Sequence, residues 1–329
     1  MKEVAAVAGV SLATVSRVVN GGPSVNPELA AKVQDAVQLL GYRHNVAASS
    51  LRRGMSASIG LIFDDVANPF FAAIHGGVEE IARARGVLTF AGSSDEAPTR
   101  ERELAEAFGA RGVDGLLIVP AVGGDHGYLQ RDVATGVALV FVDRPPRFLD
   151  ADVVLSDNAG GAALAVDHLV AHGHSRIAYL GDRSEEIYTA AERLRGYREA
   201  LTRHGLANGL SRLVTPGETG AAIDALVRGA EPPTALISGQ NLVTVAALHA
   251  LHAAGLQERL AHVGFDDVLL ADVVKPGLTV IAQDPDGLGR RAAELLFERL
   301  DGYAGPARRV VLETTLIARG SGELSATAR

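Results

Sequence analysis

The first 41 residues carry apolar side chains at helical spacing in three short runs. The first run ends at Gly9, which suits a left-handed turn, and the second begins after Ser11, a favoured N-cap residue. The third begins after Asn26, has Pro27 at its first helical position and closes at Gly41. The pattern predicts three helices, with inward positions Val4, Ala5, Ala8, Val15, Val18, Val19, Leu29, Val33, Val37 and Leu40.

The second predicted helix has an unusual outward face, made of short side chains and a single charge, Arg17. Two helices joined by a tight glycine turn, with a third behind them, form a helix-turn-helix, whose second helix enters the major groove of DNA. Short side chains can lie against base edges there, while contacts to phosphates supply affinity. A solvated three-helix cap on an enzyme would give the same pattern. The candidate DNA-contacting residues are Leu12, Ala13, Ser16, Arg17 and Asn20.

From Ile59 onward, apolar β-rich runs alternate with stretches of helical period. This alternation predicts parallel sheets covered by helices on both faces, and two successive sets of runs predict two lobes. Ligands of such sheets bind beyond the carboxyl ends of the strands. The runs lie at 58–63, 87–92, 115–120, 137–143, 176–182, 234–239, 262–267 and 278–284.

Polar or small residues follow most of these runs. A cleft between two lobes, lined by amides and carboxylates and by Phe70 and Phe71, would suit a polyhydroxylated ligand, because sugars take polar contacts at their edges and aromatic contacts on their faces. Asp143 also suits a simple strand-end turn. The residues at or just after the ends of the runs are Asp64, Asp65, Asp143, Arg144, Ser238 to Asn241, Asp266, Asp267, Gln283 and Asp284.

Composition narrows the class of protein. The 329 residues suffice for two or three compact units, and 47% apolar with 21% charged residues is typical of a globular α/β chain. The absence of cysteine excludes disulfides and thiolate metal sites, and no apolar run reaches the length of a membrane span. Charge is distributed unevenly: residues 1–58 hold six basic and three acidic side chains, a net charge of +3. Because the whole chain has a net charge of −8, the remaining residues carry −11. A basic head on an acidic body fits a phosphate partner for the head.

Three motifs in order carry a resemblance that covers essentially the whole chain. "VAAVAGVSLATVSRVVNG", "LGYRHNVAASSLRRG" and "IGLIFDDVANPFF" resemble corresponding segments of the LacI/GalR family of bacterial transcriptional repressors. The resemblance implies a small all-α helix-turn-helix head at 1–43, a hinge helix at 44–56, and an α/β body at 57–329. That body would be a two-lobed, periplasmic-binding-protein-like domain with parallel sheets that binds effector and dimerises. One departure is that the first helix begins at Met1 without a capping side chain.

The resemblance also implies roles for individual residues. The recognition helix maps onto Leu12, Ala13, Ser16 and Arg17, and the hinge leucine that wedges into the minor groove maps onto Leu51. Arg52 and Arg53 are expected to contact phosphates. Arg193 would clamp the ligand and Asp266 would accept its hydrogen bonds. The full set of candidate ligand residues is Phe70, Phe71, Asp143, Thr189, Arg193, Gln240, Asn241, Asp266 and Gln283.

The sequence therefore predicts a cytoplasmic repressor of a carbohydrate-use operon, with a near-palindromic operator and a small polar effector, a sugar or sugar derivative. A homodimer is expected, because the tail "RGSGELSATAR" has no heptad that could build a tetramer. No cofactor, metal or catalytic residue is expected. Whether the effector induces or co-represses stays open.

Other functions fit parts of the chain. A periplasmic-type sugar-binding protein would share the body but not the head, and a signal peptide at the N-terminus conflicts with Glu3 and the polar residues that follow. "GLGRRA" at 287–292 matches a dinucleotide-binding pattern, but no acidic residue follows at the spacing that such a site requires. His168, His172 and His174 resemble a metal cluster, although the family carries similar histidines without metal.

Overall fold

The computed structural model describes residues 1–19, 25–42, 56–207 and 210–326. The chain divides into two compact units, Met1–Ser56 and Ala57–Arg329, here called the head and the body. Within the described ranges, no helix combines the length and the apolarity needed to cross a bilayer.

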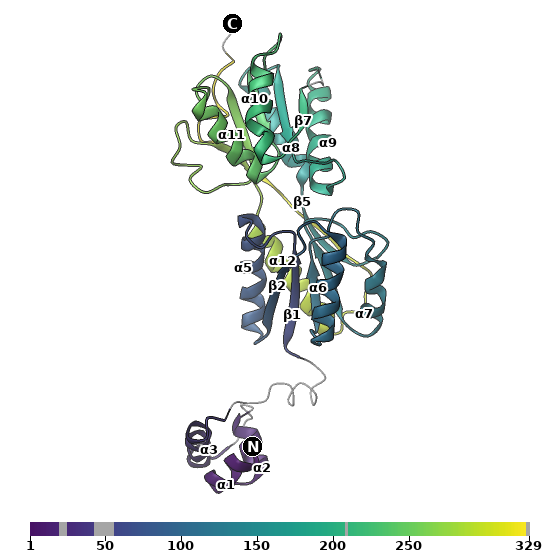
Figure 1. Ribbon diagram of the computed structural model, residues 1–329, viewed down its shortest axis with the longest axis vertical. Coiled ribbons are helices and arrows are strands. Elements are labelled where there is room, and N and C mark those ends of the chain that lie inside the picture. The colour runs from purple at the N-terminus through teal and green to yellow at the C-terminus, as the bar shows by residue number, and fades with distance from the viewer. Residues whose placement is uncertain (20–24, 43–55, 208–209, 327–329) are drawn as a thin grey trace. The chain divides into compact units, whose positions relative to one another are not determined.

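The head consists of α1 (Lys2–Ala8), α2 (Leu12–Val19) and α3 (Pro27–Leu39), labelled in Figure 1. Gly9 ends α1 with φ of 64°, in the left-handed region that the sequence predicted for it. Asn26 caps α3 by accepting a hydrogen bond from the backbone N–H of Glu28 at 2.9 Å. Met1 precedes α1 without a side-chain capping bond. The three predicted helices are confirmed, each to within a residue or two at its ends.

The core of the head is small. Its fully buried members are Val4, Val15, Val33 and Ala36. The prediction that Leu40 points inward is wrong: α3 ends at Leu39, so Leu40 lies beyond the last helical turn and is 40% exposed. Ala36, three residues after Val33, takes the inward position because it shares that helical face.

The N-terminal lobe of the body is a six-stranded sheet in the order β11-β5-β4-β3-β1-β2, entirely parallel. Alternate side chains along its strands enter two separate cores, so that Leu61 packs under α5 and α12 while Ile62 packs under α6. The elements are β1 (Ser58–Phe63), α5 (Pro69–Ala84), β2 (Leu88–Ser93), α6 (Pro98–Ala110), β3 (Gly115–Ile118), η1 (His126–Leu129), α7 (Gln130–Ala134), β4 (Ala138–Val142), β5 (Asp152–Ser156), α12 (Pro285–Leu300) and β11 (Arg309–Leu312).

The C-terminal lobe repeats this plan with the order β12-β10-β9-β8-β6-β7, in which only the β10–β12 pair is antiparallel. Helices α8 and α9 cover one face of the sheet, and α10 and α11 cover the other (Figure 1). The elements are α8 (Asn158–Ala171), β6 (Ile177–Gly181), α9 (Tyr188–Arg203), β7 (Ser211–Leu213), η2 (Pro216–Glu218), α10 (Thr219–Val227), β8 (Ala235–Ser238), α11 (Asn241–Ala253), β9 (Ala261–Phe265), β10 (Thr279–Ala282) and β12 (Thr315–Ile317).

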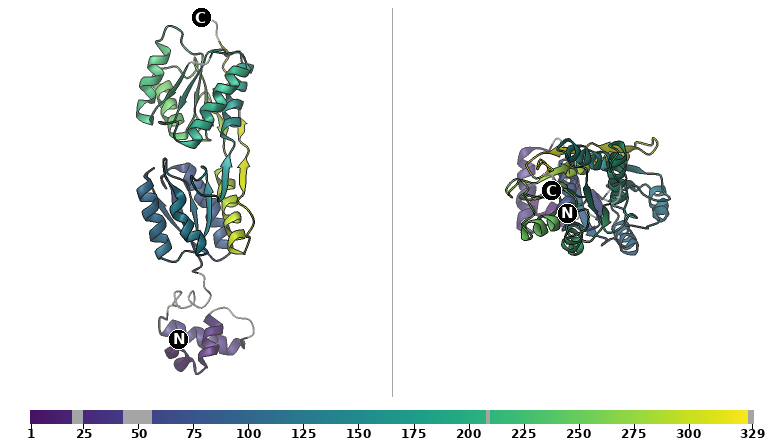
Figure 2. Two further views of the ribbon diagram at one scale, coloured as in Figure 1. Left: turned by 90° about the vertical axis from the view of Figure 1, so that its right-hand side faces the viewer. Right: turned by 90° about the horizontal axis from the view of Figure 1, so that it is seen from above.

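The chain passes between the lobes three times, from β5 to α8, from β10 to α12, and from β11 to β12. Figure 2 shows strands of the first and last passages running side by side along one side of the body. The predicted two lobes and parallel sheets are confirmed. If each lobe were built from one continuous set of strands, however, the chain would pass between the lobes only once. The return of α12 and β11 to the first lobe was not predicted.

Helices α5 and α12 approach closely through glycines. A Cβ atom on Gly77 would overlap the backbone carbonyl oxygen of Asp286, and one on Gly289 would overlap that of Ile74. Gly289 belongs to the "GLGRRA" segment, whose glycines lie in the first turns of α12 beyond the N-cap Asp284. Gly289 therefore serves helix packing, while Gly287 lies against the capping carboxylate of Asp284, to which its N–H donates at 2.8 Å.

We predict that Gly77→Ala and Gly76→Ala have opposite effects on stability. The first should lower the free energy of unfolding of the body by about 1–3 kcal/mol, because the methyl group meets rigid backbone of α12. The second should raise it by about 0.5–1 kcal/mol, because Gly76 lies on α5 with open space around it. Urea denaturation of both variants checks this, and equal effects of the two would contradict the close helix contact.

Candidate functional site

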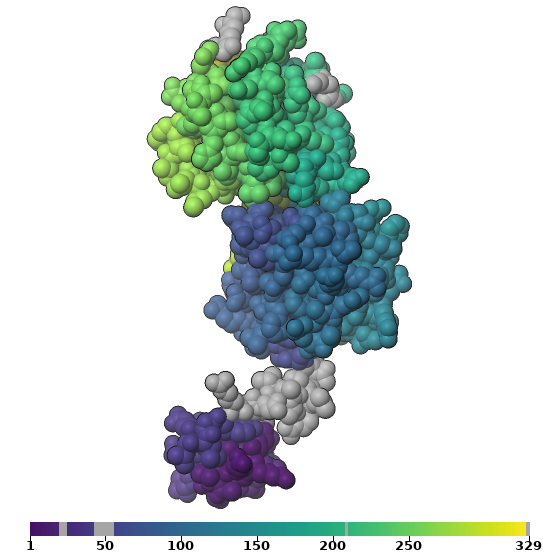
Figure 3. Space-filling model, in the orientation of Figure 1, coloured from purple at the N-terminus to yellow at the C-terminus, as the bar shows by residue number. Residues whose placement is uncertain are grey.

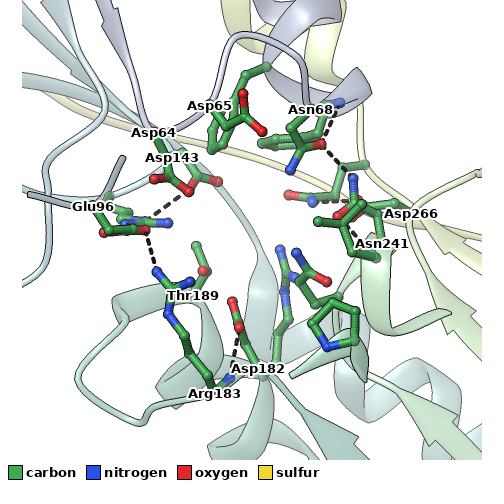
Figure 4. A pocket seen from close by; sticks show the side chains of 18 of the residues that line it. Asp64, Asp65, Asn68, Glu96, Asp143, Asp182, Arg183, Thr189, Asn241 and Asp266 are labelled. Carbon is green, nitrogen blue, oxygen red and sulfur yellow. Dashed lines mark hydrogen bonds and ion pairs between the residues drawn. The ribbon is translucent and has the colours of Figure 1, made fainter. Parts of the chain in front are cut away.

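A cleft of about 330 Å³ lies between the two lobes, where the carboxyl ends of both sheets face each other. Figure 3 shows the two lobes meeting along this boundary, and Figure 4 shows the lining side chains converging on the cleft. The structure brings together all nine predicted ligand residues: Phe70, Phe71, Asp143, Thr189, Arg193, Gln240, Asn241, Asp266 and Gln283. Their roles toward a ligand remain predictions.

The two phenylalanines differ in availability. Phe71 is 4% exposed and stacks on Phe63 with ring centroids 5.9 Å apart, so most of its surface belongs to the core of the N-terminal lobe. Phe70 is half-buried and meets Phe71 edge-on. Both start α5, which Asn68 caps by accepting a hydrogen bond from the Phe70 N–H at 3.1 Å. Phe70 therefore offers the larger free aromatic surface to the cleft.

Asp143 and Asp266 occupy equivalent positions in the two lobes, one residue after β4 and β9 respectively. Their φ angles are 69° and 70°, in the left-handed region that non-glycine residues rarely adopt. Each donates its backbone N–H to the neighbouring strand, Asp143 to Val154 O at 2.9 Å and Asp266 to Ile281 O at 2.8 Å. The ladder thus holds the strained turn, and both carboxylates reach the cleft (Figure 4).

Burial raises the pKa of both carboxyl groups, because the charged form loses hydration. Arg193 opposes that rise in each case, and Arg144 does so at Asp143. Asp266 also accepts a hydrogen bond from Gln283 Nε2 at 2.6 Å. That bond leaves Gln283 Oε1 buried and without a hydrogen-bond partner among the described residues.

Arg193 is buried on α9 and is held from three sides. Its Nε donates to Asn158 Oδ1 at 2.7 Å, its Nη1 donates to Gly239 O at 2.9 Å, and its guanidinium lies 3.9 Å from the Phe265 ring centroid. A buried guanidinium needs such partners to offset lost hydration. The contacts fix its orientation before any ligand arrives.

A chain of buried hydroxyls holds two strand ends of the C-terminal lobe. Thr244 Oγ1 lies 3.2 Å from Phe265 O and 2.8 Å from Ser238 Oγ, which lies 2.8 Å from His262 Nε2. Because the carbonyl can only accept, Thr244 donates to it, Ser238 donates to Thr244, and His262 Nε2 donates to Ser238. Burial lowers the pKa of His262 to about 3, so the imidazole stays neutral in this role. The chain ties the end of β8 to the end of β9, just before Gln240 and Asp266.

A second charged cluster lies in the N-terminal lobe, around Glu96. Arg144 Nη1 donates to Glu96 Oε1 at 2.6 Å, and its Nε lies 3.4 Å from Asp143 Oδ2. Arg183, from the other lobe, reaches within 3.9 Å of Glu96 Oε1 (Figure 4). Burial, reinforced by the Glu96 charge, raises the pKa of nearby Asp64 to about 6. The lobes are also joined by Asn241 Nδ2, which donates to Asn68 Oδ1 at 2.7 Å.

Sequence reasoning left several lining residues out of the candidate set. Asp182 and Arg183 follow the run at 176–182, so the strand-end rule used elsewhere would have found them. Asn68 and Glu96 carry no such signal: Asn68 sits at the start of α5, and Glu96 lies in a loop with φ of 56°. Only the packing of the two lobes places these two side chains at the cleft.

The outward face of α2 is the second candidate site. Val15 is buried against α1 and α3, while Leu12, Ala13 and Arg17 are exposed and Ser16 is half-buried. Ser11 Oγ accepts the backbone N–H of Thr14 at 3.1 Å and so fixes the start of the helix. The helix presents the small apolar and hydroxyl surface that the sequence predicted. Asn20, Leu51, Arg52 and Arg53 lie outside the described residues.

The three histidines whose spacing resembles a metal cluster have protein partners. His168 Nε2 lies 2.6 Å from Glu323 Oε1, and His174 Nε2 lies 2.7 Å from Leu324 O. His172 Nδ1 lies 2.8 Å from the carbonyl oxygen of His168 in the same helix. Among the described residues, no group of three or more metal-binding side chains is gathered in one place. His168 and His174 instead hold the C-terminal segment against the end of α8.

Comparisons with known proteins agree at both ends of the chain. Residues 1–45 match the model of bacterial regulatory proteins of the lacI family, and residues 166–322 match a periplasmic binding protein-like domain. The HTH-type transcriptional regulator PtxS of Pseudomonas plecoglossicida is 34% identical over 98% of this chain and 95% of its own length. A crystal structure of the lac repressor dimer bound to operator and an anti-inducer matches with a TM-score of 0.83 and 26% identity, covering 97% of each chain. A complex of the regulator CelR with cellobiose matches at 31% identity with a TM-score of 0.72, over 97% of this chain and 98% of that one.

We predict that Asp64→Asn stabilises the body in a pH-dependent manner. Because the pKa of Asp64 is raised on folding, the folded state binds the proton more tightly, and the wild-type protein loses stability as the pH rises from about 4 to above 6. The variant lacks this penalty, so its melting temperature should exceed that of the wild type by about 2–4 °C at pH 7.5. The difference should shrink toward zero at pH 4.5. Thermal melts across this range test the sign, and a constant difference at every pH would contradict it.

Proposed function

Because this chain belongs to the lacI family of bacterial regulatory proteins, we propose that it is a repressor of a carbohydrate-use operon whose DNA binding is controlled by a sugar in the cleft. The chain is a ligand-responsive, DNA-binding transcriptional regulator. The observation that carries the finer proposal is the convergence of polar strand ends from both lobes on one cleft, in a chain that also has an exposed recognition helix. A related regulator bound to cellobiose supports a sugar as the ligand class.

In this proposal the ligand is held by Arg193, Asp143 and Asp266, with Thr189, Gln240, Asn241 and Gln283 around it. Phe70 offers an aromatic face, and Phe71 supports it from the core. The cleft volume of about 330 Å³ lies at the small end of the range for ligand pockets. Ligand contacts to both lobes would favour one angle between them, which is how binding changes the body.

The head is proposed to read a near-palindromic operator through Leu12, Ala13, Ser16, Arg17 and Asn20. Arg17 is the side chain long enough to reach a base edge with two hydrogen bonds. Leu51 would enter a base step in the minor groove, and Arg52 with Arg53 would contact phosphates. We propose that residues 1–43 form the DNA-binding domain, 44–56 the hinge, and 57–329 the effector-binding and dimerisation domain of a cytoplasmic protein.

Dimerisation is proposed to cover two exposed apolar surfaces of the body. On edge strand β2, Leu88 is 67% and Phe90 42% exposed. On the C-terminal lobe, Leu242 and Val245 of α11 and Leu269 beyond β9 border an apolar hollow, with Leu269 91% exposed. A second copy of the chain would cover both, as expected for a protein with two-fold operator symmetry.

Light scattering of the wild-type protein should give the mass of a dimer, and Phe90→Asp should shift the measured mass toward that of a monomer. A monomer mass for the wild type at micromolar concentration would refute the proposed dimer.

We predict that Arg193→Ala and Asp266→Asn abolish the response of operator binding to sugar while leaving operator affinity within about threefold, because both residues lie in the body, away from the recognition helix. The matched control is Arg195→Ala, two residues along α9, where the arginine is exposed and pairs with Glu192 and Glu199. That control should respond as the wild type does. The measurement is operator binding by fluorescence anisotropy with and without sugar. Loss of operator affinity with normal sugar binding would place these residues in a different role.

We predict that head variants separate into two classes. Arg17→Ala should weaken operator binding by about 1–3 kcal/mol more than binding to scrambled DNA, and Leu51→Ala should show the same selective loss. Arg52→Ala and Arg53→Ala should weaken binding to both DNAs equally and reduce the salt dependence. Salt titrations on operator and scrambled duplexes measure both effects. Equal losses on the two DNAs for Leu51→Ala would exclude the minor-groove role.

A further inference from the structure

The cleft is strongly acidic. Seven carboxylates line it against three arginines. A cleft with this excess of negative charge repels an anion and favours a partner that donates hydrogen bonds. How much of this negative charge a ligand would meet depends on which carboxylates and arginines are already paired with other protein groups.

The two buried arginines of the cleft are committed to protein acceptors. Arg144 Nη1 donates to Glu96 and to the Pro120 carbonyl at 3.2 Å, and its Nε faces Asp143. Arg193 spends Nε on Asn158 and one Nη1 hydrogen on Gly239. The side-on fork of Nε and Nη2 binds carboxylate or phosphate with two bonds, and at Arg193 its Nε half is taken by Asn158. Arg183 is exposed at the rim and shares the Glu96 carboxylate.

The carboxylates are less well compensated. Asp64, Asp65, Asp182 and Asp266 line the cleft, and in the described ranges none of them has a lysine, arginine or histidine side-chain nitrogen within 4.0 Å. Asp182 accepts the backbone N–H of Arg183 at 2.7 Å, which brings no charge. Gln283 Oε1, beside Asp266, is a further buried acceptor that lacks a partner. The cleft groups that lack a compensating partner among the described residues are thus mainly hydrogen-bond acceptors.

We propose that the effector is an uncharged polyol and that the cleft rejects the carboxylate and phosphate forms of the same sugar. This inference rests on the proposed sugar-responsive function and narrows its ligand class. Each hydroxyl of a neutral sugar can donate to one of the free acceptors. An ionised carboxylate or phosphate group offers only acceptors, meets the unpaired aspartates at short range, and finds Nε of Arg193 already bonded to Asn158.

The experiment compares sugars that share a carbon skeleton and differ in charge. Titration calorimetry on the full chain at pH 7.5 would use glucose, gluconate and glucose 6-phosphate; ribose, ribonate and ribose 5-phosphate; and cellobiose with cellobionate. For any series that binds, the anions should bind about tenfold or more weakly than the neutral member, because like charges in the cleft repel at short range. The ratio should narrow between 50 and 500 mM NaCl, since salt screens the repulsion.

Variants that remove one negative charge show whether the weaker binding of anions arises in the cleft. Asp64→Asn should reduce the ratio of anion to neutral dissociation constants about threefold or more, because one unpaired carboxylate leaves the cleft. Asp224→Asn changes the net charge equally, but Asp224 is exposed on α10, pairs with Arg228 and lies outside the cleft lining. Its ratio should match that of the wild type, and an equal change in both variants would overturn the local account.

The outcomes separate the two proposals. Binding of a neutral sugar with exclusion of its anions supports the inference. Tighter or equal binding of gluconate, ribonate, cellobionate or a sugar phosphate overturns the inference and leaves the sugar-responsive function standing. Binding of no member of any series overturns both.

Discussion

The three passages of the chain between the lobes are the constraint on which the site depends. They leave from the ends of β5, β10 and β11, so the lobes are covalently connected at these three points, whereas across the cleft they meet through side-chain contacts such as that of Asn241 with Asn68. Residues of these passages also serve the cleft: Asn158 orients Arg193, and Gln283 donates to Asp266. The segments that connect the lobes therefore contact the groups proposed to hold the ligand. A ligand that fixes the positions of these groups must also favour one conformation of the connecting segments.

Both lobes solve the same local problem in the same way. A parallel strand must end where its polar side chain faces the cleft, and Asp143 and Asp266 do so with a left-handed residue whose N–H stays in the ladder. The cost of the unusual φ is offset by that hydrogen bond and by firm packing beneath it. In the C-terminal lobe the hydroxyl chain through Thr244 adds a further tie between neighbouring strand ends. The result is a set of acceptors whose positions do not depend on the ligand.

Sequence reasoning recovers what periodicity and strand order control. Buried central strands are recognised as apolar runs. Because parallel strands align their carboxyl ends, Gln240 and Asp266 could be placed together at one edge of the second sheet, and Asp143 at the corresponding edge of the first, without coordinates. Strands β5, β7, β11 and β12 escape this reasoning. In β11 half-buried and exposed positions alternate, and β5 opens with a buried Asp152 that is recognisable only once Arg299 and Arg308 are seen to hold it. Contacts between lobes, such as those of Glu96 with Arg183 and Asn68 with Asn241, depend on the angle between two bodies, which no local pattern encodes.

The return of α12 and β11 to the N-terminal lobe has a consequence for biosynthesis. On the ribosome the head is complete after a few dozen residues, whereas the first lobe of the body waits for residues 285–312 to cover α5 and extend its sheet. Domains tend to fold as they emerge, so a nascent or prematurely terminated chain would present a finished recognition helix joined to an unfinished sensor with its apolar α5 face uncovered. Because α12 is synthesised late, a chain that lacks it would have a complete head but no complete ligand-binding body. Removal of such chains is therefore needed if every DNA-binding copy is to respond to ligand.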